Sequence, residues 1–154
     1  MPAGWRIVPT QRAAAAFTGQ GARCYGARWN SPGSAVVYLS EHLSLAALEV
    51  LVHRHLHRWT CEFLAYRAEW DEELMQRLPP TALPPNWRGE PPADGLRALG
   101  DAWVRESRSA ILGVPSVIIP EELNFLLNPA HPDFKNIRLG KPQPFALDPR
   151  LVAG

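Results

Sequence analysis

Proline is the residue that most limits the folds open to this 154-residue chain, because 16 prolines are spread along it. Each proline removes a backbone N–H group and breaks a helix interior, so a long coiled coil or a helical bundle is disfavoured. Six prolines fall within residues 79–92, which we expect to form an irregular surface loop. Apolar residues make up 46% of the chain and charged residues 20%, which is ordinary for a globular domain with its own core.

Charge and cysteine content exclude several classes of protein. The net charge is only +1, whereas a protein that coats nucleic acid normally carries a basic excess. Two cysteines, Cys24 and Cys61, are too few for the disulfide framework of a small secreted domain. The sequence has no signal-peptide pattern and no apolar run of about 18 residues. We therefore expect a single cytoplasmic domain over residues 1–154, with no membrane contact and no direct binding of nucleic acid.

The pattern of apolar, β-branched and turn residues predicts strands and helices in a mixed order. Strands are expected at residues 5–8, 35–40, 61–70, 111–119, 134–139 and 144–147. Helices are expected at residues 13–17, from Ser40 or Ser44 to about residue 58, at 71–78, at 94–108, and as a short turn from residue 120 that Asn128 ends, with a loop at 19–22. This order indicates an α+β fold with mixed, mostly antiparallel sheets and flanking helices, not an alternating doubly wound sheet.

Glu49 is the residue whose position is hardest to explain by packing alone. At 100° per residue, Leu45, Leu48, Val52 and Leu56 form one apolar stripe on the helix predicted to run to about residue 58. Glu49 lies four residues after Leu45, inside that stripe. A carboxylate there is costly unless it is paired, hydrogen-bonded or lining a cavity, so Glu49 is a candidate functional residue.

Several short segments, taken in order, resemble the RES-domain family. They are Gly26-Ala27-Arg28-Trp29-Asn30-Ser31-Pro32-Gly33, Val36-Val37-Tyr38, Ala46-Ala47-Leu48-Glu49, Val114-Pro115-Ser116, Asn124-Phe125-Leu126-Leu127-Asn128-Pro129 and His131-Pro132-Asp133-Phe134. The resemblance extends from Trp5 to Arg150. One departure is Ala27, where the family often has a second glycine.

The resemblance implies a fold similar to that of ADP-ribosyltransferase toxins, and a toxin of a bacterial RES–Xre toxin–antitoxin pair. Members of the family consume NAD, and an Xre-type antitoxin, encoded next to the toxin, neutralises them. Their key residues map onto Arg28, Glu49 and Ser116, usually with Tyr38. Toxins of this kind often pair with themselves, and exposed tryptophans would favour a homodimer here.

The chemistry of NAD cleavage suits these residue types. The reaction passes through an oxocarbenium-like state, which a fixed carboxylate such as Glu49 can stabilise. Arg28 can bind pyrophosphate oxygens or pair with that carboxylate. Tyr38 can stack on nicotinamide, and Ser116 can bond ribose or orient Glu49. The residues expected to bind NAD are Arg6, Arg28, Trp29, Asn30, Tyr38, Ser116 and Asn124.

NAD is expected as a substrate and not as a cofactor, because the chain has neither a dinucleotide-binding glycine fingerprint nor a Walker lysine loop. No metal is expected either. His53, His55 and His57 have metal-like spacing, but no carboxylate or cysteine nearby completes a ligand set, so a solvated helix face explains them better. Glu62 and Glu69 are rival carboxylates, of which Glu69 is expected to pair with Arg67, two residues before it.

Each catalytic candidate also has a purely structural explanation. Glu49 could form a buried ion pair, Arg28 could brace its turn, Tyr38 could be core packing, and Ser116 could be a small polar filler. The function likewise stays open between an NAD glycohydrolase or phosphorylase and an ADP-ribosyltransferase that modifies a protein. A non-catalytic partner-binding module and a hydrolase of nucleotide sugars are the rivals from other classes.

Overall fold

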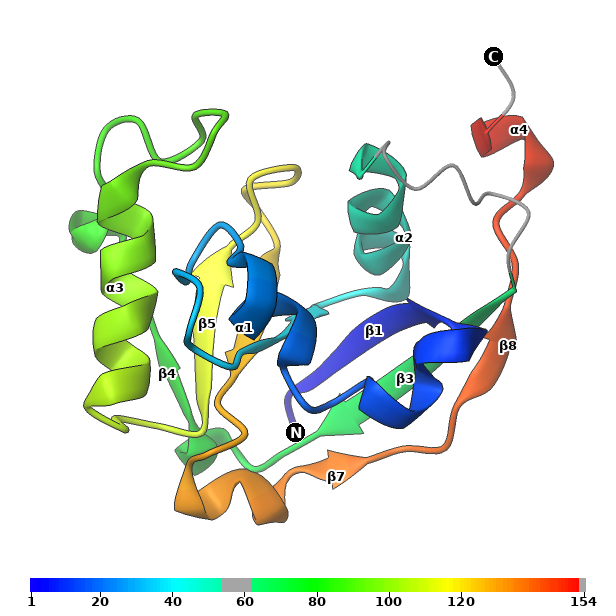
Figure 1. Cartoon of the computed structure of the whole chain (residues 1–154), viewed down its shortest axis with the longest axis horizontal. Helices are drawn as coiled ribbons and strands as arrows, with labels where there is room; N and C mark the ends of the chain where they lie inside the picture. The colour runs from blue at the N-terminus through cyan, green and yellow to red at the C-terminus, as the bar shows by residue number, and fades with distance from the viewer. Residues whose placement is uncertain (54–61, 153–154) are drawn as a thin grey trace.

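The computed structural model describes residues 1–53 and 62–152 of the chain, and its strands form one strongly twisted sheet (Figure 1). The strand order is β4-β5-β6-β2-β1-β3-β7, and β8 also pairs with β3. All pairs are antiparallel except β4 with β5. The strands are β1 (Ala3–Pro9), β2 (Val37–Ser40), β3 (Phe63–Glu69), β4 (Met75–Arg77), β5 (Ile111–Pro115), β6 (Leu123–Leu127), β7 (Arg138–Leu139) and β8 (Gln143–Phe145). The predicted α+β fold with a mainly antiparallel sheet is confirmed.

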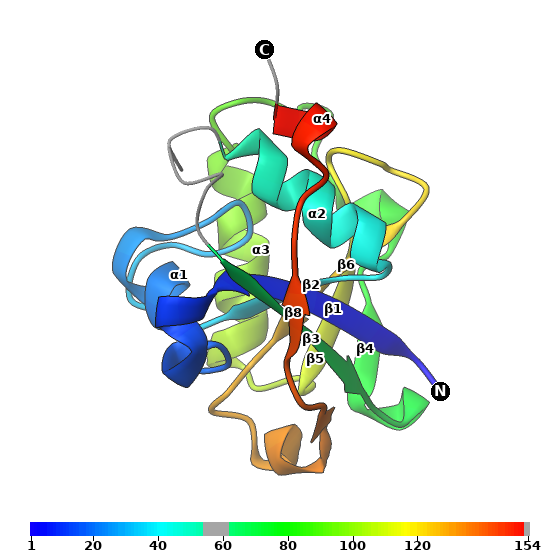
Figure 2. The same cartoon turned by 90° about the vertical axis from the view of Figure 1, so that its right-hand side faces the viewer.

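Helices cover the sheet unevenly. The helices are α1 (Gln20–Tyr25), α2 (Leu43–Val52), α3 (Asp94–Arg105) and α4 (Pro149–Val152), and short 3-10 helices lie at Thr10–Ala15, Glu72–Leu74, Pro80–Ala82 and Pro132–Asn136. Figure 2 shows α2 above β1 and β2, against which it packs. None of the helices within the described ranges has the length and apolar character needed to span a bilayer.

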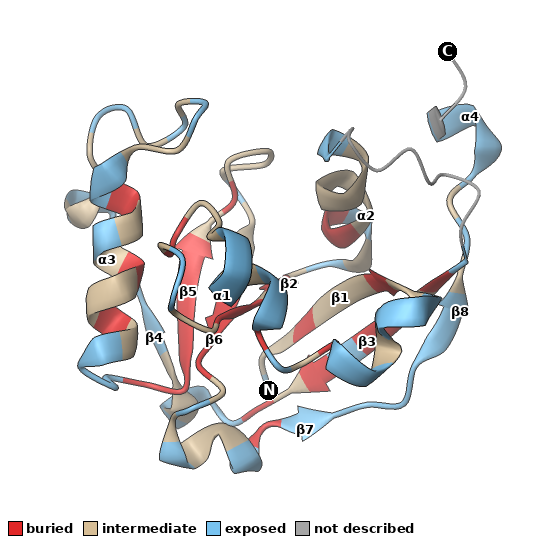
Figure 3. Cartoon of the chain, viewed as in Figure 1, coloured by how far each residue is buried: buried red, intermediate tan, exposed pale blue. Residues whose placement is uncertain are grey.

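The central strands are buried on both faces. Side chains alternate along each strand, so neighbouring residues belong to two different core clusters. Val37, Leu39 and Phe125 belong to one core cluster, together with Trp70. Leu112 and Leu126 belong to another, which includes the apolar side of α3. Buried residues are concentrated in β2, β3, β5 and β6 and on one side of α3 (Figure 3). We call the sheet face that carries Leu112 and Leu126 the α3 face and the other the opposite face.

Helix α3 confirms the predicted helix at residues 94–108 in its position and in its buried side. Leu96 and Trp103 are 0% and 1% exposed, and the half-buried Leu99 packs on the same cluster. The helix ends at Arg105, and its N-cap residue is Ala93, without a side-chain cap. Asp94 is the first residue of the helix and not its cap.

Three predicted elements are wrong. The sequence predicts a loop at residues 19–22, but α1 begins at Gln20. Residues 71–78 were expected to be a helix, but they form a 3-10 turn followed by edge strand β4, which pairs with β5. The helical turn expected from Pro120 is replaced by β6, because Leu123–Leu127 pairs with β2 on one side and β5 on the other.

Helix α2 is shorter than predicted. It begins at Leu43 after an extended His42, with no side-chain cap, and it ends at Val52. His53 has non-helical torsion angles and caps the helix. Residues 54–58 of the predicted helix lie outside the described residues. His55 and His57 lie outside the described residues.

The argument for a homodimer from exposed tryptophan has no support in the structure. Trp29, Trp70 and Trp103 are almost fully buried, and Trp5 and Trp87 are half-buried. The sixth tryptophan, Trp59, lies outside the described residues.

Candidate active site

Glu49 lies on the side of α2 that meets the sheet, as its place in the apolar stripe predicts. Leu45 and Ala46, one turn earlier, are 1% and 4% exposed, and Glu49 is half-buried. The stripe does not continue along the helix, since Val52 is 52% exposed. The carboxylate is therefore held at the edge of the core with part of its surface accessible.

Ser116 directly follows β5 and brings the loop between β5 and β6 to Glu49. Its side chain is fully buried, and its Oγ accepts the backbone N–H groups of Ile118 and Ile119 at 3.1 Å each. The same hydroxyl donates to Glu49 Oε1 over 3.5 Å. The two N–H groups fix the direction of the hydroxyl, so its proton is available to the carboxylate. Ser116 is thus hydrogen-bonded to Glu49, and its predicted role in orienting that carboxylate stays a prediction.

The electrostatics of Glu49 link it to two more of the predicted residues. Burial raises the pKa of the Glu49 carboxyl, and hydrogen bonding from Asn124 and Ser116 and the positive charge of Arg28 oppose that rise. Asn124 lies on β6, on the α3 face, and its Nδ2 donates to Ser40 Oγ at 3.2 Å. The site therefore combines α2, β6, the loop after β5 and the turn that carries Arg28.

Arg28 does not pair with Glu49, one of the two options that the sequence left open for it. Among the described residues its ion-pair partner is Glu90, with Nη2 to Oε2 at 2.7 Å. Its Nη1 donates to the carbonyl oxygen of Gly89 at 2.8 Å and to that of Trp87 at 3.5 Å. Glu90 is 62 residues away along the chain, and no local pattern in the sequence could have indicated this pair.

Tyr38 supports the turn that contains Arg28. Its hydroxyl donates to Asn30 Oδ1 at 2.6 Å and accepts the backbone N–H of Trp29 at 3.3 Å. Burial raises the pKa of Tyr38, so the hydroxyl stays protonated. Trp29 is itself 2% exposed and belongs to the core cluster beneath α3. The expected stacking of Tyr38 on nicotinamide and the expected contact of Trp29 with NAD stay predictions.

Asn30 and α3 complete the support of this turn. Asn30 is fully buried, and its Nδ2 donates to the carbonyl oxygens of Ala22, Ser31 and Ser34 at 3.0 to 3.1 Å. From α3, Arg97 Nε donates to the carbonyl oxygen of Ala27, and Asp101 Oδ1 accepts the N–H of Ser31. We therefore assign Asn30 a structural role in the turn. Its predicted contact with substrate remains untested.

Comparison with known proteins identifies the family of this chain. The RES domain family matches residues 3–148. The chain belongs to the RES domain family. This RES domain is 39% identical over 148 residues to "Toxin Res" of Yersinia enterocolitica, covering 96% of this chain and 97% of that protein. It is 38% identical over 158 residues to "Prs ADP-ribosylating toxin" of a Sphingobium species, covering 96% and 95% of the two chains. These similarities place it among the RES toxins.

The fold of this RES domain is also that of a solved structure. A chain in the crystal structure of the M. tuberculosis MbcT–MbcA toxin–antitoxin complex superposes with a TM-score of 0.77. The match covers 94% of this chain and 84% of that chain, at 16% sequence identity. The similarity concerns the fold alone. It supports the α+β fold expected from the sequence.

Arg6 of this RES domain lies on β1. Its Nε donates to the carbonyl oxygen of Ala16 at 2.6 Å, and its Nη1 to that of Tyr38 at 3.0 Å. Burial lowers its pKa to about 10. Two backbone carbonyls thus fix this guanidinium, and its predicted contact with a phosphate group stays a prediction.

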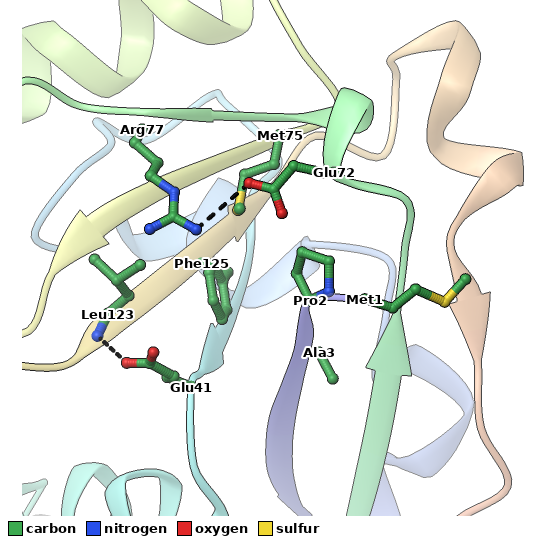
Figure 4. Close-up of a pocket in the computed structure, with 9 residues that line it drawn as sticks. All are labelled: Met1, Pro2, Ala3, Glu41, Glu72, Met75, Arg77, Leu123 and Phe125. Carbon is green, nitrogen blue, oxygen red and sulfur yellow. Dashed lines mark hydrogen bonds and ion pairs between the residues drawn. The ribbon is translucent and has the colours of Figure 1, made fainter.

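Two other features of the described RES domain lie apart from Glu49. Glu41, His42 and Glu122 place ligand atoms within 4.8 Å of one another and could hold a metal ion. Acidic groups near the surface commonly cluster in this way without a metal, so we assign none. A hollow of about 300 Å³ is shown in Figure 4. Its lining residues are Met1, Pro2, Ala3, Glu41, Glu72, Met75, Arg77, Leu123 and Phe125. Phe125 belongs to the cluster on the opposite face, so this hollow is not the Glu49 site.

Proposed function

We propose that this RES toxin is the toxin of a toxin–antitoxin pair and that it consumes NAD by cleaving the bond between nicotinamide and ribose. The observation that carries the proposal is the half-buried Glu49 carboxylate, to which Ser116 donates a hydrogen bond and which lies within the electrostatic influence of Arg28. The ADP-ribosylating activity named for the Sphingobium relative supports a substrate that contains ADP-ribose.

In the proposed reaction the bond between ribose C1′ and the nicotinamide nitrogen breaks, and its electron pair leaves with neutral nicotinamide. The sugar passes through an oxocarbenium-like state, whose positive charge the ionised Glu49 stabilises. A water molecule then bonds to C1′ and loses a proton, which gives ADP-ribose. With phosphate as acceptor, the same first step makes the enzyme a phosphorylase.

The other predicted residues would bind the substrate. Arg28 supplies a cation for the pyrophosphate, and Asn124 offers a polar group beside Glu49. Tyr38 and Trp29 hold the turn in place and would contact nicotinamide only where their edges reach the site. NAD is the substrate in this scheme, and neither a cofactor nor a metal is required.

The partner in this proposal is an Xre-type antitoxin encoded next to the toxin gene. It would neutralise the toxin by covering the site between α2 and α3. Consumption of NAD implies action in the cytoplasm, where the antitoxin is made. Self-association into a homodimer stays open and can be measured by light scattering.

An NAD-depletion assay on purified protein free of antitoxin tests the activity. Glu49→Gln keeps the shape of the side chain and is expected to lower kcat by on the order of 100-fold. Glu69→Gln is the matched control, because Glu69 is an exposed carboxylate on β3 that pairs with Arg67 and Arg138. Full activity of Glu49→Gln, or no nicotinamide release by the folded parent, would disprove the proposal.

A second candidate is an ADP-ribosyltransferase that modifies a cellular protein, favoured by the name of the Sphingobium relative. It shares the bond cleavage and differs only in the acceptor. Mass spectrometry of the product separates the two, since the transferase leaves ADP-ribose on a protein. Should neither product form while a partner still binds, the non-catalytic binding module would be the correct alternative.

A further inference from the structure

Residues 87–90, at the end of the proline-rich loop, connect two parts of the candidate site. Gly89 and Glu90 accept hydrogen bonds from Arg28. Arg88 directly precedes Gly89 in the chain. Its Nε and Nη2 donate to the carbonyl oxygen of Val117 at 3.2 and 2.9 Å. Val117 directly follows Ser116. This short segment therefore spans from the turn of Arg28 to the loop of Ser116, which is hydrogen-bonded to Glu49.

The segment is anchored on the core. Trp87 and Leu83 pack against the cluster beneath α3. Two tight turns shape it, with Trp87 N donating to the Pro84 carbonyl oxygen at 3.1 Å and Gly89 N to that of Asn86 at 2.9 Å. Apolar anchors and turn hydrogen bonds together make a fixed connection, which we call the 87–90 bridge.

The 87–90 bridge holds Arg28 by one end of its guanidinium. Nη1 donates to two carbonyl oxygens, and Nη2 donates to Glu90. These bonds occupy three of the five N–H groups of an arginine. The remaining two, Nε–H and the second N–H of Nη2, form the side edge of the planar group and make no hydrogen bond to the described residues. The Arg28 side chain as a whole is 17% exposed, so part of it remains accessible from outside.

We propose that the 87–90 bridge positions Arg28 for substrate, with Glu90 as its positioning residue. The bridge fixes the end of the guanidinium and leaves its side edge for a bidentate contact with the phosphate groups of a dinucleotide. The inference rests on the proposed function and adds to it the way in which the phosphate-binding cation is oriented. A competing role for Glu90, as an anion that substrate must displace, predicts the opposite change in affinity.

Three variants test this positioning role. Glu90→Ala removes the acceptor, and Glu90→Gln keeps an amide oxygen that can accept the Arg28 hydrogen bond. Glu106→Ala is the matched control, because Glu106 forms a comparable exposed ion pair with Arg108 at the end of α3. The readouts are KM and kcat for NAD, the Kd of inorganic pyrophosphate by calorimetry, and the ¹⁵N spectrum of the Arg28 guanidinium, assigned through Arg28→Lys.

Glu90→Ala is expected to raise KM and the pyrophosphate Kd by about fivefold with kcat nearly unchanged, since an exposed ion pair contributes little more than this. Glu90→Gln should restore most of that loss, and Glu106→Ala should change nothing. Separate Nη1 and Nη2 signals are expected in the parent, because the bridge restricts rotation about Cζ–Nε, and an averaged signal in Glu90→Ala.

The results distinguish failure of this inference from failure of the proposed function. Unchanged or tighter pyrophosphate binding by Glu90→Ala would overturn the positioning role, as would averaged Nη signals in the parent. Failure of the parent to cleave NAD would instead refute the proposed function. The pyrophosphate and NMR measurements need no catalysis, so they decide the role of Glu90 in either case.

Discussion

The Glu49 carboxyl destabilises the folded state when it is ionised. Burial raises its pKa above the ordinary value of 4.5, so as pH rises the unfolded chain loses the proton before the folded chain does. Stability contributed by this residue is therefore lost from about pH 4.5 upward, until Glu49 is ionised in both states. Glu49→Gln removes this loss. We expect the variant to be more stable than the parent near neutral pH and equal to it well below pH 4.5, as measured by urea unfolding.

Glu69 provides a control, because its pKa is shifted in the direction opposite to that of Glu49. Hydrogen bonding to Arg67, and to Arg138, lowers the pKa of the Glu69 carboxyl. Its stabilising contribution is present above the ordinary pKa and is lost as pH falls through the lowered value. Glu69→Gln is thus expected to be slightly less stable than the parent near neutral pH. If both variants shift stability in the same direction, the burial of Glu49 is not the cause.

The hydroxyl of Tyr38 is expected to contribute mainly to the stability of the fold. Tyr38→Phe leaves the Asn30 carbonyl group and the Trp29 N–H without their partner in a buried position. Such a loss costs about 1–3 kcal/mol in the free energy of unfolding. Urea unfolding measures this change, and steady-state kinetics measure kcat beside it. A large fall in kcat with unchanged stability would instead indicate that the hydroxyl contacts the substrate.

The sequence predicts individual residues well where the cause is local. Glu49 could be placed on the inner side of its helix because helical periodicity depends only on near neighbours. The expected pair of Glu69 with Arg67, two residues away, is present for the same reason. The ion-pair partner of Arg28 could not be predicted from the sequence. Glu90 is brought to Arg28 by an irregular loop, whose course hydrophobic periodicity does not predict.

At the scale of the elements, α3 packs closely against the turn that carries Arg28, at Gly100 of the helix and Trp29 of the turn. A Cβ atom added at Gly100 would lie 1.7 Å from the carbonyl oxygen of Trp29. Backbone cannot yield as a flexible side chain can, so the helix or the turn must move. We expect Gly100→Ala to lower the free energy of unfolding by about 3 kcal/mol, as overpacking does. It should also raise KM, because Arg28 is on the displaced turn.

Gly95 on the same helix supplies the control. A Cβ there would meet only Pro84 Cγ, at 3.9 Å, which is an ordinary contact. Gly95→Ala should therefore leave activity unchanged and stabilise the helix by up to about 1 kcal/mol through propensity. Equal stability of the two variants in urea unfolding would show that α3 can shift away from Trp29 at no cost.

Two of the three elements that the sequence mispredicts share a physical cause. Residues 120–123 begin with proline and two acids, which is typical of a helix start, yet Leu123–Leu127 is strand β6 because it fills the space between β2 and β5. Edge strand β4 was mistaken for a helix for the same reason: its pairing with β5 joins residues far apart in sequence. Non-local pairing overrides local preference in both segments.

At the scale of the whole molecule, the two faces of the sheet separate the candidate site from the hollow in Figure 4. Neighbouring residues of β6 point to opposite faces, so Asn124 belongs to the Glu49 site while Phe125 lines the hollow. One strand thus carries both candidates for a ligand-binding surface. A measurement that resolves single segments can decide between them.

Hydrogen exchange with and without NAD makes that decision, using Glu49→Gln so that the substrate is not consumed. We expect binding to slow exchange in residues 27–31 and 116–119, because the substrate would be held by Arg28 and would restrict the loop of Ser116. Ala3, Met75 and Arg77, which line the hollow, should exchange at the same rate in both samples. The same holds for β7 and β8 at the far edge of the sheet. Slower exchange confined to Ala3, Glu41, Met75 and Arg77 would move the binding site to the opposite face. In that case Arg28 and Glu49 would serve only to hold the turn and α2 against the sheet.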